Sequence, residues 1–156
     1  MGNGSPPVTW AALMAELMVS DFAASMAFWT GPMGFAVAFD RPAQRFACLQ
    51  RPEGAQIMVY QRDGDWETGV LEPPYGRGAI IQVYVADVLA LHAAFTAAGW
   101  PFYVPLREKW RDWGDRLGGQ REFLVQDPDG YLVMVVERLG ERGVNGTGPT
   151  AATPSP

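Results

Sequence analysis

Two glutamates are the residues of this chain best placed to do chemistry inside an apolar pocket. Glu16 interrupts the apolar run Trp10–Val19, and Glu122 lies in the mixed run Arg121–Gln126. A carboxylate that faces an apolar cavity loses hydration, so it needs a cationic partner or takes a raised pKa. A cationic ligand is one such partner and a neighbouring arginine is another, whereas a carboxylate at the rim of the pocket would stay in water and need neither. The candidate arginines are Arg62, Arg116 and Arg121.

The same two glutamates could instead act as a general acid and base. That role requires a pKa near neutrality and a substrate proton within reach. Neither Ser, Lys nor His falls on the strand face expected to carry the two carboxylates. A metal-free lyase or isomerase that uses Glu16 or Glu122 as general base is therefore kept as the alternative to a binding protein.

The chain has few ligands for a metal ion. It contains one histidine, His92, and one cysteine, Cys48, whereas metal enzymes usually use imidazole or thiolate ligands. His92 is expected on a helix away from the pocket, so a metal site would have to be built mainly of carboxylates. The composition therefore argues against a metal enzyme, and we expect no cofactor. A single cysteine excludes an internal disulfide and fits a reducing compartment, which predicts a cytoplasmic protein.

Composition also limits the partners. The formal net charge is −5 and the isoelectric point is about 4.8, which argues against nucleic-acid binding through a basic patch. The longest apolar runs are shorter than the ~18 residues of a membrane span. Residues 1–7 lack the basic region and apolar core of a signal peptide. We therefore expect neither nucleic acid nor membrane as a partner.

The elements that must position these residues follow a β-α-β-β-β order in the first half of the chain. Residues 1–9 are rich in Gly, Pro and Ser and are expected to be flexible. The first module, residues 10–61, begins with a strand over Trp10–Val19. Asp21 or Ser20 then caps a helix with an apolar stripe from Phe22 to Met33. The three following strands are expected at 35–39, 45–50 and 56–61.

The same order repeats after a linker at residues 62–78, which is polar and contains Gly and Pro. In the second module, residues 79–140, a strand at 79–85 precedes a helix capped by Asp87. A strand at 101–106 and a long loop follow. The module ends in a hairpin whose turn is Asp127-Pro128-Asp129-Gly130, a sequence suited to a tight turn. Residues 141–156 are of low complexity and are expected to form a disordered tail.

Two such modules predict an α+β fold in which two βαβββ modules form a curved eight-stranded sheet cup with the helices outside. Alternation along the strands predicts which side chains face the hollow of the cup. This face is apolar and aromatic with few polar groups, as small-molecule sites are. Its predicted residues are Met14, Glu16, Met18, Met58, Tyr60, Ile80, Gln82, Tyr84, Glu122, Leu124, Met134 and Val136.

Tryptophans in polar segments are further candidates for ligand contact. Trp110 and Trp113 lie in the charged segment from Arg107 to Arg116, which is expected to be a loop. Exposed indoles there could stack on a flat heteroaromatic ligand and on its positive charge. They could equally be buried against a partner subunit. Trp66, in the linker, has the same two interpretations.

With these features, residues 10–140 resemble the vicinal oxygen chelate superfamily, the glyoxalase/bleomycin-resistance/dioxygenase fold. The resemblance rests on the segments that flank each helix and on the closing hairpin. The motifs are Val19-Ser20-Asp21, Gly34-Phe35, the second Val-x-Asp at 85–87, Arg121-Glu122-Phe123 and Asp127-Pro128-Asp129-Gly130 followed by Glu137.

The resemblance implies where a metal would bind, because metal enzymes of this superfamily take one ligand from each of four strands. In this chain those positions hold Met14, Met58, Ile80 and Met134, none of which is His, Glu or Asp. The chain is therefore similar to the metal-free, bleomycin-resistance-like branch. The segment Phe28-Trp29-Thr30 also looks like that branch.

Proteins of that branch sequester a bulky cationic glycopeptide antibiotic without altering it, and they are typically dimers with crevices at the interface. The resemblance thus implies a metal-independent protein of antibiotic resistance that binds a small molecule, either of the bleomycin type or another cationic, aromatic compound. It also implies a homodimer. A binder of some hydrophobic metabolite is kept as a further alternative.

Overall fold

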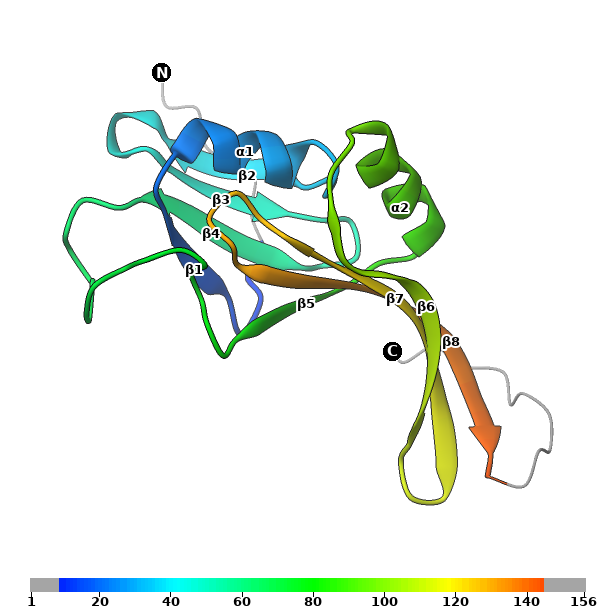
Figure 1. The fold of residues 1–156 in the computed structure, drawn as a ribbon. Coiled ribbons are helices and arrows are strands. Elements are labelled where there is room, and N and C mark those ends of the chain that lie inside the picture. Colours follow the sequence, from blue (N-terminus) through cyan, green and yellow to red (C-terminus); the bar gives the residue numbers. More distant parts are fainter. Residues whose placement is uncertain (1–8, 145–156) are drawn as a thin grey trace. The chain divides into compact units, whose positions relative to one another are not determined.

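The computed structural model describes residues 9–144, which divide into two compact units (Figure 1). The first unit contains the chain up to Ala79 together with the turn segment Gln126–Tyr131. The second unit contains Ile80–Val125 and the chain from Leu132 onward. Each unit carries one βαβββ module.

The first unit is a four-stranded sheet with one helix against it. Its strands follow the order β1-β4-β3-β2, with β1 and β4 parallel and the other pairs antiparallel. The elements are β1 (Ala15–Val19), α1 (Phe22–Thr30), β2 (Ala36–Arg41), the 3-10 turn η1 (Pro42–Gln44), β3 (Phe46–Gln50) and β4 (Gln56–Gln61).

Helix α1 begins where the sequence predicts, because Asp21 caps it by accepting a hydrogen bond from the backbone N–H of Ala24 at 3.0 Å. The helix packs on β3 and β4. Phe28 and Trp29 of the helix are buried, as are Leu17 and Val19 on the alternate positions of β1. The opposite face of β1 is thereby left for Glu16 and Met18.

Strand β1 is shorter than predicted, since residues 10–14 form no strand. The side chain of Gln56 provides the reason. It accepts from the backbone N–H of Ala11 at 2.8 Å and donates to the carbonyl of Thr9 at 2.7 Å. These bonds take the place of strand pairing, so the chain joins the sheet only from Ala15.

The second unit repeats the arrangement with longer strands. Its order is β5-β8-β7-β6, with β5 and β8 parallel and β6 and β7 antiparallel. Asp87 caps its helix through the N–H of Ala90 at 2.9 Å, as predicted. The α+β class and the two βαβββ modules are thus confirmed, with one four-stranded sheet in each. The elements are β5 (Ile80–Tyr84), α2 (Val88–Ala97), β6 (Phe102–Asp112), β7 (Arg116–Gln126) and β8 (Leu132–Gly143).

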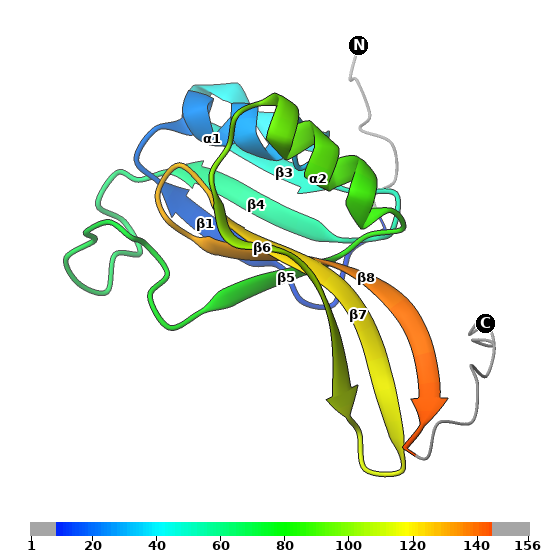
Figure 2. The same cartoon turned by 45° about the vertical axis from the view of Figure 1, so that its right-hand side comes forward.

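The long loop predicted after residue 106 is wrong, because β6 continues to Asp112 and pairs with β7, which lies between β6 and β8 (Figure 2). Glycines make this hairpin possible. A Cβ atom on Gly119 would lie 2.6 Å from the ring of Trp110, and one on Gly118 would lie 2.2 Å from the ring of Trp113. The two indoles therefore cover glycines, which a pattern of charged residues does not reveal.

The predicted linker is an ordered part of the first unit, although residues 62–79 contain no helix or strand. Tyr75 is buried, its N–H donates to the carbonyl of Asp129 at 2.8 Å, and its hydroxyl accepts from Arg62 at 2.8 Å. At the far end, β8 includes 141–143, which the sequence assigns to the tail. Residues 1–8 and 145–156, where flexible segments are predicted, lie outside the described residues. Neither α1 nor α2 of the described chain is long and apolar enough to cross a membrane.

Candidate functional site

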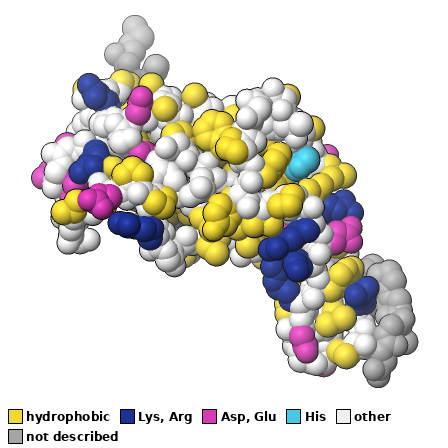
Figure 3. Space-filling model, viewed as in Figure 1, with side chains coloured by type: hydrophobic (Ala, Val, Ile, Leu, Met, Phe, Trp, Pro, Cys, Tyr) yellow, Lys and Arg dark blue, Asp and Glu magenta, His cyan; other side chains and the backbone are white. Residues whose placement is uncertain are grey.

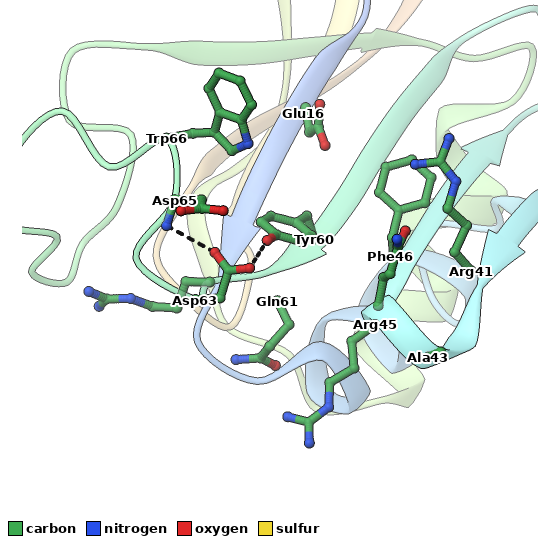
Figure 4. A pocket seen from close by; sticks show the side chains of 12 residues that line it. Glu16, Arg41, Ala43, Arg45, Phe46, Tyr60, Gln61, Asp63, Asp65 and Trp66 are labelled. Carbon is green, nitrogen blue, oxygen red and sulfur yellow. Dashed lines mark hydrogen bonds between the residues drawn. The ribbon is translucent and has the colours of Figure 1, made fainter.

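A cleft of about 740 Å³ lies in the first unit (Figure 4). Strand β1 contributes Glu16 to its lining, and β4 contributes Tyr60. The segment after β4 and the turn before β3 complete the walls. A smaller hollow of about 360 Å³ is lined by Glu16, Met18, Tyr60 and Trp66. Its residues largely coincide with one end of the cleft.

Strand register explains why these side chains meet. In the parallel pair of β1 and β4, Glu16 is opposite Met58 and Met18 is opposite Tyr60, so all four lie on one face of the sheet. Leu17, between the two β1 residues, is buried on the other face. The alternation predicted from sequence and the structure thus agree that Glu16, Met18 and Tyr60 share a face, and their contact with a ligand stays a prediction. Met58 shares their face but does not line the cleft.

The acidic wall of the cleft is organised by a hydrogen bond from the hydroxyl of Tyr60 to the carboxylate of Asp63. That bond raises the pKa of Tyr60 to about 12 and lowers the pKa of Asp63. The other oxygen of Asp63 accepts from the backbone N–H of Asp65 at 3.0 Å. At neutral pH the wall therefore carries a neutral phenol beside a charged carboxylate.

Glu16 stands at the aromatic end of the cleft, near Trp66 and Tyr60 (Figure 4). Within residues 9–144 its carboxylate has neither a hydrogen bond nor an ion pair. Arg62, one of its candidate partners, is bound instead to Glu67 at 2.8 Å. An exposed carboxylate beside two aromatic rings can attract a cation, and the rings can stack against that cation.

Arg41 and Arg45 lie on the opposite side of the cleft from Asp63 and Asp65 (Figure 4). The guanidinium of Arg41 stacks over the ring of Phe46 at 4.7 Å, and Arg45 has the left-handed backbone conformation that ends the 3-10 turn. Sequence reasoning missed this wall and the two aspartates, because Arg41, Asp63 and Asp65 lie outside the predicted strands and Arg45 is only the first residue of one. The available signal was the run Asp63–Trp66, which places two carboxylates and an indole directly after the strand of Tyr60.

Charge is divided unequally between the units. The first unit contains ten Asp and Glu residues and five Lys and Arg residues, whereas the second contains seven of each kind. The formal net charge of −5 therefore belongs entirely to the unit that has the cleft.

In the second unit, Glu122 is fully buried and paired with two arginines. Arg107 and Arg111 each approach its carboxylate to 3.0 Å. The partners predicted from sequence were wrong, because Arg107 becomes the cross-strand neighbour of Glu122 once β6 replaces the expected loop. Arg116 is bound to Asp115 and Glu141, and Arg121 is bound to Glu108.

The remaining predicted residues of the second unit lie on neighbouring strands. Gln82 pairs with Met134 and Tyr84 with Val136 in the register of β5 and β8, and Ile80 begins the same face of β5. Leu124, on β7, is buried. A ligand role for these six residues stays a prediction.

The tryptophans of the hairpin have intramolecular contacts. Trp110 is half-buried beneath the guanidinium of Arg142, 4.0 Å from its ring centre, whereas Trp113 is 50% exposed. Stacking of either indole on a ligand stays a prediction. His92 lies on α2 and stacks on Phe102 at 4.6 Å.

The four positions at which the fold family would hold a metal do not fit one. Met14 and Met58 are in the first unit, and Ile80 and Met134 are in the second. Thioether and alkyl side chains provide none of the imidazole or carboxylate donors that such an ion takes.

Comparisons with known proteins identify the fold family. Residues 11–135 match the family model described as the Glyoxalase/Bleomycin resistance protein/Dioxygenase superfamily. No curated protein matches the chain. Among solved structures, TioX from Micromonospora sp. ML1 is similar with 24% identity and a TM-score of 0.61, over 92% of this chain and 100% of that one.

Two further structures show the same fold. Virulence protein STM3117 from Salmonella typhimurium has 18% identity and a TM-score of 0.60, over 84% of this chain and 98% of that one. Lactoylglutathione lyase from Agrobacterium tumefaciens has 20% identity and a TM-score of 0.54, over 83% and 96%. Since the family model spans most of the chain, the protein belongs to the glyoxalase/bleomycin resistance protein/dioxygenase superfamily.

Proposed function

We propose that this protein is a metal-independent binding protein that sequesters a bulky, cationic, aromatic small molecule, as bleomycin-resistance proteins do. The observation that carries the proposal is the cleft of the first unit, where the unpaired carboxylate of Glu16 stands beside Trp66 and Tyr60. A cation held there would be close to a negative charge and to two aromatic faces.

The size and charge of the cleft support this ligand class. Its volume of about 740 Å³ lies within the range of roughly 300–1,000 Å³ that is usual for drug-sized ligands. Each cation–π contact contributes about 0.5–2 kcal/mol. Asp63 and Asp65 add negative charge, and the net charge of the first unit attracts cations over a longer distance.

Isothermal calorimetry with a bleomycin-type drug tests the proposal. We expect Glu16→Gln and Trp66→Ala each to weaken binding by about tenfold, which corresponds to about 1.4 kcal/mol. Glu72→Gln is the matched control, because it removes the same charge from an exposed position of the same unit that does not line the cleft. Absence of binding, or an equal loss in all three variants, would contradict a specific site.

The enzymatic alternative depends on the same carboxylate. Glu16 reaches the cleft and is free to accept a proton from a bound molecule, whereas Glu122 is enclosed by Arg107 and Arg111. Mass spectrometry of the drug after prolonged incubation separates the two functions. Sequestration predicts an unchanged mass and structure, and conversion that is lost in Glu16→Gln would establish a metal-free lyase or isomerase.

The proposal extends to assembly and biological role. A homodimer is expected from the bleomycin-resistance branch, with Trp110 and Trp113 as candidate contacts for ligand or partner. The buried free thiol of Cys48 is compatible with a cytoplasmic protein. Sedimentation velocity tests the dimer, and a raised inhibitory concentration of the drug in expressing bacteria tests antibiotic resistance.

A further inference from the structure

A buried carboxylate in the second unit is surrounded by more positive charge than it can neutralise. Glu122 has no exposed surface. One of its oxygens accepts from Arg107 Nε at 3.1 Å and Nη2 at 3.0 Å, and Arg111 Nη2 donates to both oxygens at 3.1 and 3.0 Å. Two guanidinium groups thus share one carboxylate, which leaves a net positive charge at the surface of this sheet.

Further hydrogen bonds connect this cluster to Gln120 and Tyr84. Arg111 Nη1 donates to Oε1 of Gln120 at 2.6 Å. Because a guanidinium can only donate, this bond fixes the orientation of the Gln120 amide. Its Nε2 therefore donates to the hydroxyl oxygen of Tyr84 at 3.0 Å, and Gln82 Nε2 donates to the same oxygen at 2.9 Å. With two bonds accepted, the hydroxyl proton of Tyr84 is directed away from both amides.

The face of the sheet that carries Glu122 and Tyr84 also presents hydrogen-bond donors that have no acceptor among the described residues. In the described part of the chain, Arg107 Nη1 and Arg111 Nε have no acceptor, and the side chains of these arginines are 39% and 41% exposed. The guanidinium of Arg138 lies over the ring of Tyr84 at 4.6 Å. Lys and Arg side chains gather over the strands β6 to β8 (Figure 3). Ile80, on the face of β5 that carries Tyr84, is 54% exposed and adds an apolar surface.

We propose that this face binds an organic anion, a carboxylate or phosphate group attached to an aromatic or apolar body. Arg107, Arg111 and the hydroxyl of Tyr84 donate to the anionic oxygens, and Ile80 contacts the body of the ligand. The site lies in the second unit and shares no residue with the cleft of the first unit, so it does not rest on the function proposed above. It assigns opposite ligand charges to the two units.

NMR of protein labelled with ¹⁵N-arginine tests the site, with benzoate, phenyl phosphate and neutral benzamide as probes. We expect saturable shifts of the Nε–H signals of Arg107 and Arg111 with at least one anion, and none with benzamide. If only benzoate saturates the signals, the site is assigned to carboxylates, and if only phenyl phosphate does so, it is assigned to phosphates. Saturation by both probes assigns the site to the oxyanion chemistry that the two groups share.

Variants separate a specific site from general charge. Arg111→Gln should weaken anion binding at least tenfold, and Tyr84→Phe several-fold. Both variants should fold, because Glu122 keeps Arg107 in the first and the aromatic ring remains in the second. Arg116→Gln removes the same charge from the same hairpin and should change affinity less than twofold.

Three results would overturn the inference. They are the absence of saturable binding by either anion, binding of benzamide as tight as that of benzoate, and an equal loss in Arg116→Gln and Arg111→Gln. Glu16→Gln should leave anion binding unchanged while it weakens binding of the cationic drug. The two proposals can therefore fail independently.

Discussion

At the scale of single residues, Asp127 makes stability depend on pH. Its Oδ1 accepts from the backbone N–H groups of Asp129 at 3.0 Å and Tyr131 at 2.9 Å. Burial nevertheless dominates and raises the pKa of Asp127 to about 6. The folded protein thus holds this proton more tightly than the unfolded chain, where the pKa is about 3.9.

The free energy of unfolding is therefore expected to fall as pH rises from about 4 to about 6, by at most about 3 kcal/mol from this group. Urea unfolding at pH values between 4 and 7 measures the change. In Asp127→Asn this contribution should disappear, whereas Asp65→Asn, at an exposed position, should keep it. The expectation is contradicted if the difference in unfolding free energy between wild type and Asp127→Asn rises with pH over this range.

The pair of Tyr60 and Asp63 makes a second prediction at this scale. Since the hydrogen bond to Asp63 is the main cause of the raised pKa of Tyr60, Asp63→Asn should lower that pKa from about 12 toward the ordinary value near 10. Ultraviolet titration of phenolate formation measures it, with Tyr60→Phe spectra subtracted to remove the other tyrosines. An unchanged titration would show that the bond does not form in solution.

At the scale of elements, the hairpin of β6 and β7 depends on glycine beneath an indole. Gly119→Ala would place a methyl group 2.6 Å from the ring of Trp110, which also has the guanidinium of Arg142 stacked over it at 4.0 Å. Because the ring cannot move freely, we expect a loss of about 1–3 kcal/mol in unfolding free energy. Thermal or urea unfolding measures this loss.

The matched control is Gly69→Ala, where an added Cβ has no atom within 4 Å and the backbone needs no positive φ. That change should have little effect. In a double-mutant cycle, Trp110→Ala should remove most of the penalty of Gly119→Ala. Additive losses would show that the clash with the indole is not the cause.

The sequence predicts helices and strand faces well because these depend on local patterns. The caps Asp21 and Asp87 and the alternation of β1 are examples. The prediction fails where a side chain distant in sequence determines the local structure, as Gln56 does for residues 9–11. It also fails where a turn forms part of the site. Glu16 and Tyr60 could be assigned to one face, but the aspartates after β4 could not, since the path of that segment depends on tertiary contacts.

At the scale of the whole molecule, the two modules have the same fold but differ in net charge. The acidic excess lies with the cleft, and the second unit is neutral overall yet presents guanidinium groups on its sheet. The same architecture thus carries an acidic excess in one unit and exposed guanidinium groups in the other. Total net charge, which sequence analysis must use, describes neither surface.

Because of the turn after β7, the two repeats cannot be separated without the loss of hydrogen bonds. Residues 126–131 belong to the first unit although their flanking strands belong to the second. There Asp129 binds Ser20 through both the hydroxyl and the backbone N–H, the latter at 2.9 Å, and the Tyr131 hydroxyl donates to the carbonyl of Met18 at 2.9 Å. An excised first repeat would lose all these bonds.

A chain cut between Gly78 and Ala79 should therefore behave as a split protein. We expect fragments 1–78 and 79–156 to be poorly stable alone and to copurify when coexpressed, since each completes the other. Asp129→Ala should reduce copurification more than Asp112→Ala, which is exposed in the other hairpin. A first fragment that folds cooperatively by itself would show the repeats to be independent. If neither fragment folds alone, the two fragments can serve as a two-part reporter whose assembly depends on the contacts of the turn at 126–131.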